Sequence, residues 1–186
     1  MRVRLGLLLT ALLNVGFGAP DPGGASATAD PCAAFSWDVT HERALFGETP
    51  QRLSAGLAPG DSPALATGRL YELTLAPQSQ VHFAAAPEKS RSTDGYAGLA
   101  VLRLPSAGVY RIALDQPIWV DVVSEGTQVH SRDFQGRSGC SAPHKIVEFV
   151  LPAKVALTLQ LSSASSPTVR VAVLAAPPHE HDVDKT

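Results

Sequence analysis

Positive charge, cysteine and aromatic side chains are all scarce in this 186-residue chain. Its 15 Lys and Arg residues are outnumbered by 17 Asp and Glu residues, which gives a formal net charge of -2. Proteins that bind nucleic acid use a surplus of cationic side chains to neutralise phosphates, and this chain has no such surplus. It also lacks a glycine-rich loop at either common phosphate-binding spacing. The composition therefore disfavours nucleic acids and nucleotides as ligands.

Charged residues of both signs are few, at 17% of the chain against roughly 25% in typical soluble domains. Apolar residues make up 45%, and Gly and Pro number 15 each. This combination is too apolar for a disordered chain and is typical of a folded domain with many turns. We therefore expect one domain over residues 30–176, between a leader at 1–29 and a flexible tail at 177–186.

The N-terminus has the composition of a secretory signal peptide. A short basic start at residues 1–4 precedes an apolar run over residues 5–17. This run is shorter than the roughly 20 residues that a membrane span needs, and no later stretch comes close. Small residues allow cleavage near Gly18 or after Ala29, and both sites stay open. We expect an exported protein, periplasmic or secreted, with no membrane span after cleavage.

The chain has two cysteines, Cys32 and Cys140. Export places them in an oxidising compartment, where a pair of this kind is expected to form a disulfide. The two positions are 140 − 32 = 108 residues apart. Closing a loop on the order of 100 residues stabilises a protein by about 4 to 5 kcal/mol in chain-entropy terms. The sequence therefore predicts a stabilising disulfide.

One helix is expected near the start of the mature chain, within residues 30–47. Asp30 can cap it, Pro31 suits its first position, and Gly47 can end it. The segment 48–68 has little apolar periodicity and is rich in Pro, Gly, Ser and Ala. We expect this second segment to be a surface connection.

Beyond residue 70 the apolar residues alternate with polar ones, which is the period of a half-buried β-strand. The alternation is clearest in six segments: 70–75, 81–85, 110–114, 147–151, 155–161 and 169–173. Three weaker candidates are 98–104, 118–124 and 128–134. The pattern predicts an all-β fold, an antiparallel β-sandwich or jelly roll of about eight or nine strands with one short N-terminal helix.

The stretch 107–114, with alternating strands on either side, resembles the bacterial pre-peptidase C-terminal (PPC) domain, a small β-sandwich that accompanies secreted enzymes. This likeness extends loosely over residues 70–174 and concerns the fold. It suggests a larger exported protein as one kind of partner.

Nearly the whole mature chain is similar to a group of uncharacterised exported bacterial β-sandwich proteins. The segments that carry this likeness are 32–38, 42–46, 119–123, 133–136, Cys140 and 143–149. Some members of the group are labelled homogentisate 1,2-dioxygenase, an enzyme whose iron is held by two His and one carboxylate. No His-x-His followed by Glu lies in the predicted strands, so the residues do not favour that chemistry here.

Polar side chains gather around the second cysteine and on two predicted strands. Seven of them could form a ligand-binding patch: Arg111, Trp119, Asp121, Arg132, Asp133, His144 and Lys145. Paired donors on a surface held by the disulfide would suit a small polar, anionic or sugar-like ligand. The alternative is structural, with Arg111 and Asp121 forming a cross-strand ion pair and Trp119 lying in the core.

The remaining candidate site is a metal-binding one. His179, His181 and Asp182 form the densest group of metal-ligating side chains, in the tail beyond two prolines. A second possibility combines His130 and His144 with Asp133 or Asp121. A divalent metal is thus the one cofactor that the sequence allows, and none is required.

We therefore expect an exported, non-catalytic β-sandwich that acts as a binding or accessory protein. Its partner would be a small polar or anionic ligand or a larger exported protein. The alternative is a metal-dependent enzyme with oxygenase-like chemistry.

Overall fold

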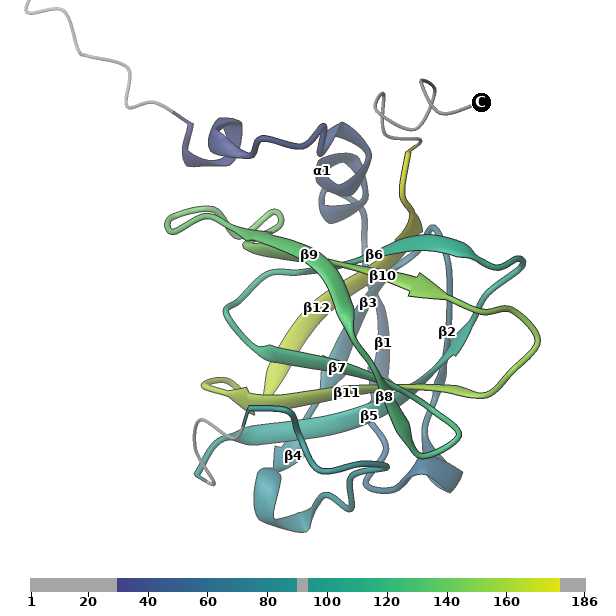
Figure 1. Ribbon diagram of the computed structural model, residues 1–186. Coiled ribbons are helices and arrows are strands. Elements are labelled where there is room, and N and C mark those ends of the chain that lie inside the picture. The colour runs from purple at the N-terminus through teal and green to yellow at the C-terminus, as the bar shows by residue number, and fades with distance from the viewer. Residues whose placement is uncertain (1–29, 90–93, 178–186) are drawn as a thin grey trace, which may run out of the picture.

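Two six-stranded sheets pack face to face in the computed structural model, which describes residues 30–89 and 94–177 (Figure 1). Sheet A has the strand order β1 (Gln51–Ser54), β3 (Leu70–Thr74), β12 (Thr168–Ala175), β6 (Gly108–Leu114), β10 (Lys145–Leu151) and β9 (Ser131–Gly136). Sheet B has the order β2 (Ala64–Ala66), β5 (Tyr96–Arg103), β11 (Leu157–Ala164), β7 (Trp119–Ser124) and β8 (Thr127–Val129), with β4 (Ala76–Pro77) paired to β5. The predicted all-β sandwich is confirmed.

The core lies between the sheets and follows the predicted alternation. Tyr110, Ile112 and Leu114 on β6 of sheet A point into the core. From sheet B, Leu157 and Leu159 on β11 point into the same core. These side chains are almost fully buried. Removing such apolar surface from water is the main force that holds two sheets together.

The strand prediction differs from the structure in the segments 48–68 and 128–134. The first is not a plain surface connection, because it contains β1 and β2, which run parallel to β3 and β5. Leu65 on β2 is 1% exposed, so even this short strand adds to the core. The second segment is two strands, since the chain leaves sheet B after β8 and enters sheet A as β9.

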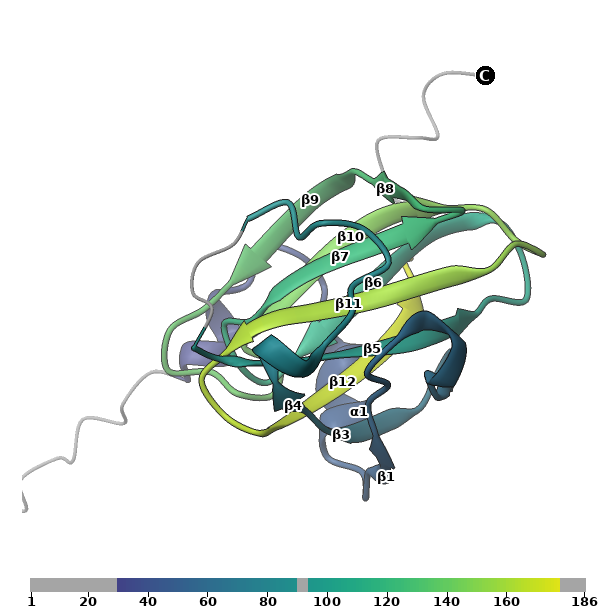
Figure 2. The same cartoon turned by 90° about the horizontal axis from the view of Figure 1, so that it is seen from below.

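The predicted strand at 81–85 is wrong. A short 3-10 helix, η3 (Gln78–Gln80), leads instead into an irregular segment, residues 81–89, which we call the strap. The strap crosses the outer face of sheet B in front of β11 and β7 (Figure 2). Gln160 holds it there, because its side-chain amide both donates to the carbonyl of Ala85 and accepts from its N–H, each at 3.1 Å. These side-chain bonds take the place of strand pairing.

The N-terminal helix is divided into a 3-10 turn, η1 (Pro31–Ala34), and one α-helix, α1 (Thr40–Phe46). A further 3-10 turn, η2 (Pro59–Asp61), lies between β1 and β2. The division occurs at Asp38, whose carboxylate accepts from the N–H of Thr40 at 2.9 Å and so begins a new helix. Within the described ranges, no helix is both long and apolar enough to span a membrane.

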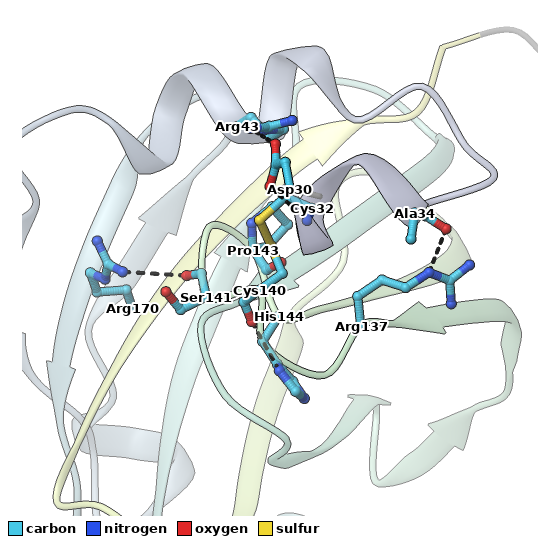
Figure 3. The surroundings of a disulfide bond; sticks show 10 residues. All are labelled: Asp30, Cys32, Ala34, Arg43, Arg137, Cys140, Ser141, Pro143, His144 and Arg170. Atoms are coloured by element: carbon cyan, nitrogen blue, oxygen red, sulfur yellow. Dashed lines mark hydrogen bonds and ion pairs between the residues drawn. A yellow bond between two sulfur atoms is a disulfide. The ribbon is translucent and has the colours of Figure 1, made fainter. Parts of the chain in front are cut away.

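The predicted disulfide joins Cys32 in η1 to Cys140 in the loop before β10 (Figure 3). The same region holds further contacts between the N-terminal segment and this loop. Arg137 of this loop donates to the carbonyl of Ala34. Within the N-terminal segment itself, Asp30 forms an ion pair with Arg43 of α1 at 2.8 Å. The disulfide therefore fixes the N-terminal segment against sheet A.

Arg111 anchors α1 to the outer face of sheet A. Its guanidinium forms ion pairs with Glu148 at 2.9 Å and with Glu42 of α1 at 3.2 Å. It also donates to the carbonyl of Asp38, and its Cζ atom lies 4.7 Å from the centroid of the Trp37 ring. All three charged side chains are at most 3% exposed. A buried cation is stable only with partners of this kind.

Replacing Arg111 by Met should therefore lower the free energy of unfolding by about 3 to 5 kcal/mol, because two carboxylates lose their buried partner. Urea unfolding measures this loss. As a matched control, Arg43→Met breaks an exposed ion pair (43% and 47% exposed side chains) and should cost less than about 1 kcal/mol. Equal losses in the two variants would contradict the anchoring role.

Candidate functional site

Strand β7 lacks a neighbour along part of one edge. All of it, Trp119–Ser124, pairs with β11, but on the other side β8 pairs only with residues 122–124. In the part of the chain that the structure describes, no strand pairs with residues 119–121 on that side. The first half of β7 is thus an open edge, next to the point where the chain passes from sheet B to sheet A.

A cleft lies at this open edge, between β7 of sheet B and strands β9 and β10 of sheet A. It consists of two adjoining hollows of about 200 and about 210 Å³, both lined by Trp119, Phe134 and Lys145. The first hollow is also lined by Ile118, His144 and Ser163, and the second by Glu88, Lys89, Asp121 and Val129. We call this the Trp119 cleft.

Trp119 forms one wall of the cleft and is held by its own strand. Its indole Nε1 donates to Oδ1 of Asp121 at 2.8 Å, because residues two apart on a strand share a face. The ammonium groups of Lys89 and Lys145 lie 5.0 and 5.1 Å from the ring centroid. Contacts of this kind are cation–π interactions. The indole is therefore fixed in orientation, with a carboxylate at its N–H and two ammonium groups near its ring.

Phe134 forms a second wall. It lies opposite Val147 in the register of β9 and β10, and Val147 belongs to the core between the sheets. Phe134 is on the same face, but it is 65% exposed, which is the largest value among the large apolar side chains of residues 30–89 and 94–177. An aromatic ring in the wall of a cleft, with this much surface in water, is suited to contact a ligand.

His144 lies at the end of the cleft nearest the disulfide, and Lys145 lines both hollows. The ammonium of Lys145 donates to the carbonyl of Ile118 at 3.0 Å. The Nδ1 atom of His144 lies 3.1 Å from the carbonyl oxygen of Cys140, as Figure 3 shows. Because a carbonyl only accepts, this contact places the proton of a neutral imidazole on Nδ1. The disulfide-bonded loop thus orients a side chain that lines the cleft.

Asp121 lies beneath the strap and is 4% exposed. The backbone N–H of Glu88, on the strap, donates to Oδ2 of Asp121 at 3.4 Å. Burial raises the pKa of Asp121 above 3.8, opposed by the hydrogen bonds from Trp119 and Glu88 and by the charge of Lys145. The charge of Glu88 adds to the rise in pKa. Asp121 therefore serves to position Trp119, since its oxygens already accept hydrogen bonds.

Four of the seven residues predicted for the patch line the Trp119 cleft. These are Trp119, Asp121, His144 and Lys145. The interpretation of Trp119 as a core residue is wrong, because its side chain is only half-buried and lines the cleft.

The other three predicted residues lie elsewhere. Arg111 is beneath α1, on the outer face of sheet A, and its partners are Glu42 and Glu148. The alternative of a cross-strand pair between Arg111 and Asp121 is therefore wrong, since the two residues belong to different sheets. Arg132 and Asp133 are exposed on β9 and line neither hollow.

Sequence reasoning missed Phe134, Lys89 and Ser163 as cleft residues. Phe134 is an apolar side chain within a polar segment, and that isolation could have singled it out. Lys89 is on the strap, beyond the segment 81–85 that the alternation predicts as a strand, and its position over Trp119 had no signal in the sequence. Ser163 lies at a bulge of β11 with a φ of 59°.

The described residues include no group of three or more His, Cys, Asp or Glu close enough to hold a metal ion. His144 and Asp121 line different hollows of the cleft, and His130 and Asp133 line neither. The predicted metal ligands His179, His181 and Asp182 are in the tail, outside the described residues.

No protein-family model matches this chain, and no match was found among the curated proteins. The resemblance to the PPC domain and to the exported β-sandwich proteins therefore stays a prediction. The functional argument that follows depends on the geometry of the cleft.

Replacing Asp121 by Asn removes its titration and keeps an oxygen that can accept from Trp119. Since the folded-state pKa is raised, the unfolded chain loses this proton first as the pH rises. The stability that Asp121 contributes is therefore fully present below pH 3.8 and is lost as the pH rises through the folded pKa. Urea unfolding from about pH 3 to about pH 7 should show Asp121→Asn gaining stability relative to the unchanged protein. A constant difference across this range would contradict the burial argument.

Proposed function

We propose that this protein is an exported, non-catalytic binding protein that holds a small ligand in the Trp119 cleft. The single observation that carries the proposal is the exposed ring of Phe134 in the wall of a cleft whose other wall, Trp119, is held in one orientation. Isolated exposed apolar side chains are common, but two aromatic walls with charged groups between them are typical of ligand sites.

The cleft is built before any ligand arrives. Asp121 accepts from the Trp119 indole, Lys145 donates to Ile118, and the strap lies over Asp121. A site that is already ordered pays little conformational entropy on binding, so that even a small contact area gives useful affinity. This rigidity favours binding of a preferred ligand over adaptable contact with many partners.

Export is supported by two independent features. The first 17 residues have the composition of a signal peptide. The 32–140 disulfide is of the kind that persists in oxidising compartments. A periplasmic or secreted protein with a preformed cleft is suited to capture a solute outside the cytoplasm. The metal-dependent alternative gains no support, because the cleft lacks a set of metal ligands within the described residues.

The experiment uses protein expressed from Met1 in a bacterial host and released by osmotic shock. Export predicts that this fraction has lost its N-terminal segment and that Cys32 and Cys140 resist alkylation without reductant. Retention of Met1, or alkylation of both thiols, would contradict the exported part of the proposal.

Binding is measured by the fluorescence of Trp119, which becomes the only tryptophan in Trp37→Phe. The probes are benzoate, cyclohexanecarboxylate, benzamide, glucuronate and galactose. At least one should change the emission saturably, and Phe134→Ser should weaken that binding about tenfold through lost apolar contact. Val150→Ser removes another exposed apolar side chain (58% exposed) away from the cleft and should leave affinity unchanged. If no probe binds, or if both serine variants behave alike, the proposed function is wrong.

A further inference from the structure

We propose that the ligand of the Trp119 cleft is a compact organic acid, with one ring between Trp119 and Phe134 and its carboxylate beside Lys145. This inference rests on the proposed function and narrows it to a ligand class. Three features of the cleft carry it: the balance of charge, the apolar walls with their size, and an unused hydroxyl group.

The charge of the cleft favours an anion. Two ammonium groups, those of Lys89 and Lys145, lie about 5 Å from the centroid of one indole ring. Lys145 is common to both hollows, so a ligand in either part of the cleft lies near it. A cation inside a partly enclosed site interacts with an anion more strongly than it does in bulk water.

The carboxylates of the cleft do not cancel this preference. Asp121 is buried, its two oxygens accept from Trp119 and from the backbone of Glu88, and it faces the strap. Both of its oxygens are therefore already engaged by groups of the protein. Glu88 itself is exposed and borders only the second hollow. Among the described residues, the first hollow has Lys145 and His144 as its ionisable side chains and is lined by no carboxylate.

The walls favour a single ring. Trp119 and Phe134 border both hollows, and the buried side chains Val120, Val147 and Phe149 lie beneath the second. A ligand seated in one hollow must be compact, because each hollow measures about 200 Å³ and sites for drug-sized ligands begin at roughly 300 Å³. A flat ring could cover the exposed face of Phe134, which is 65% exposed.

Ser163 provides a further group that fits an acid. It lines the first hollow, and its Oγ atom is buried without a hydrogen-bond partner among the described residues. The residue is on a bulge with positive φ, a conformation that costs free energy in a residue other than glycine. Buried hydroxyls are normally paired, so a ligand oxygen in this hollow would complete the site.

The test compares benzoate with benzamide, which has the same ring and nearly the same shape but no charge, by calorimetric titration of the full mature protein. Cyclohexanecarboxylate and its amide form a second pair. Each acid should bind at least about tenfold more tightly than its amide, and rising salt should reduce this ratio. Lys145→Met, which keeps the apolar stem, should bring the ratio of acid affinity to amide affinity close to one. Lys154→Met, on an exposed turn, should leave the ratio unchanged.

The outcomes separate the two proposals. If an amide binds as tightly as its acid, or if Lys145→Met and Lys154→Met give the same ratio, the organic-acid inference is overturned and the cleft remains a binding site. The same holds if galactose binds and the acids do not. If none of these compounds binds, the proposed function fails along with the inference.

Discussion

Each sheet of this sandwich can bury its inner side chains only where the other sheet lies opposite, and this constraint decides where the molecule has a core and where it has a site. Along β6 and β11 the two sheets overlap, and the apolar residues are sealed from water. At β7 and β9 the overlap is incomplete, because β8 is too short to cover Trp119–Asp121. The inner face of β9 therefore continues past the core, and Phe134 meets solvent. The cleft is thus a consequence of unequal sheet edges.

Buried polar contacts hold the segments that cover the outer faces. On sheet A, Arg111 joins α1 to the sheet through Glu42 and Glu148, and the disulfide holds the preceding turn. On sheet B, Gln160 and Asp121 hold the strap. Buried polar groups of this kind specify one geometry because any other leaves them without partners. Each of these covering segments adds a side chain to the cleft. The disulfide-bonded loop orients His144 in the first hollow, and the strap contributes Lys89 to the second.

The sequence supported the fold better than the site, for a physical reason. Alternation in 110–114, 147–151 and 169–173 reports which side chains share a face, and this is sufficient to predict a sandwich. It does not report which strands are neighbours, so Arg111 and Asp121 could be placed together although they lie on different sheets. Nor does it report where a neighbouring strand ends, and this left Phe134 unnoticed. The part of the strap at 81–85 is predicted as a strand because its apolar residues also alternate. The side chain of Gln160, distant in sequence, instead satisfies the backbone of Ala85.

The most direct test of the central claim is a titration of the ¹⁵N-labelled mature protein with benzoate, followed through the indole N–H signals of its two tryptophans. Trp37 belongs to the N-terminal segment and lies against Arg111 on the outer face of sheet A, whereas Trp119 lines the cleft. The two signals therefore report on different parts of the sandwich. The account predicts a saturable shift of the Trp119 indole signal, together with the backbone amide of Lys145, while the Trp37 signal stays in place. Immobile signals at both tryptophans, or equal shifts at both, would contradict an organic-acid site at the open edge of β7.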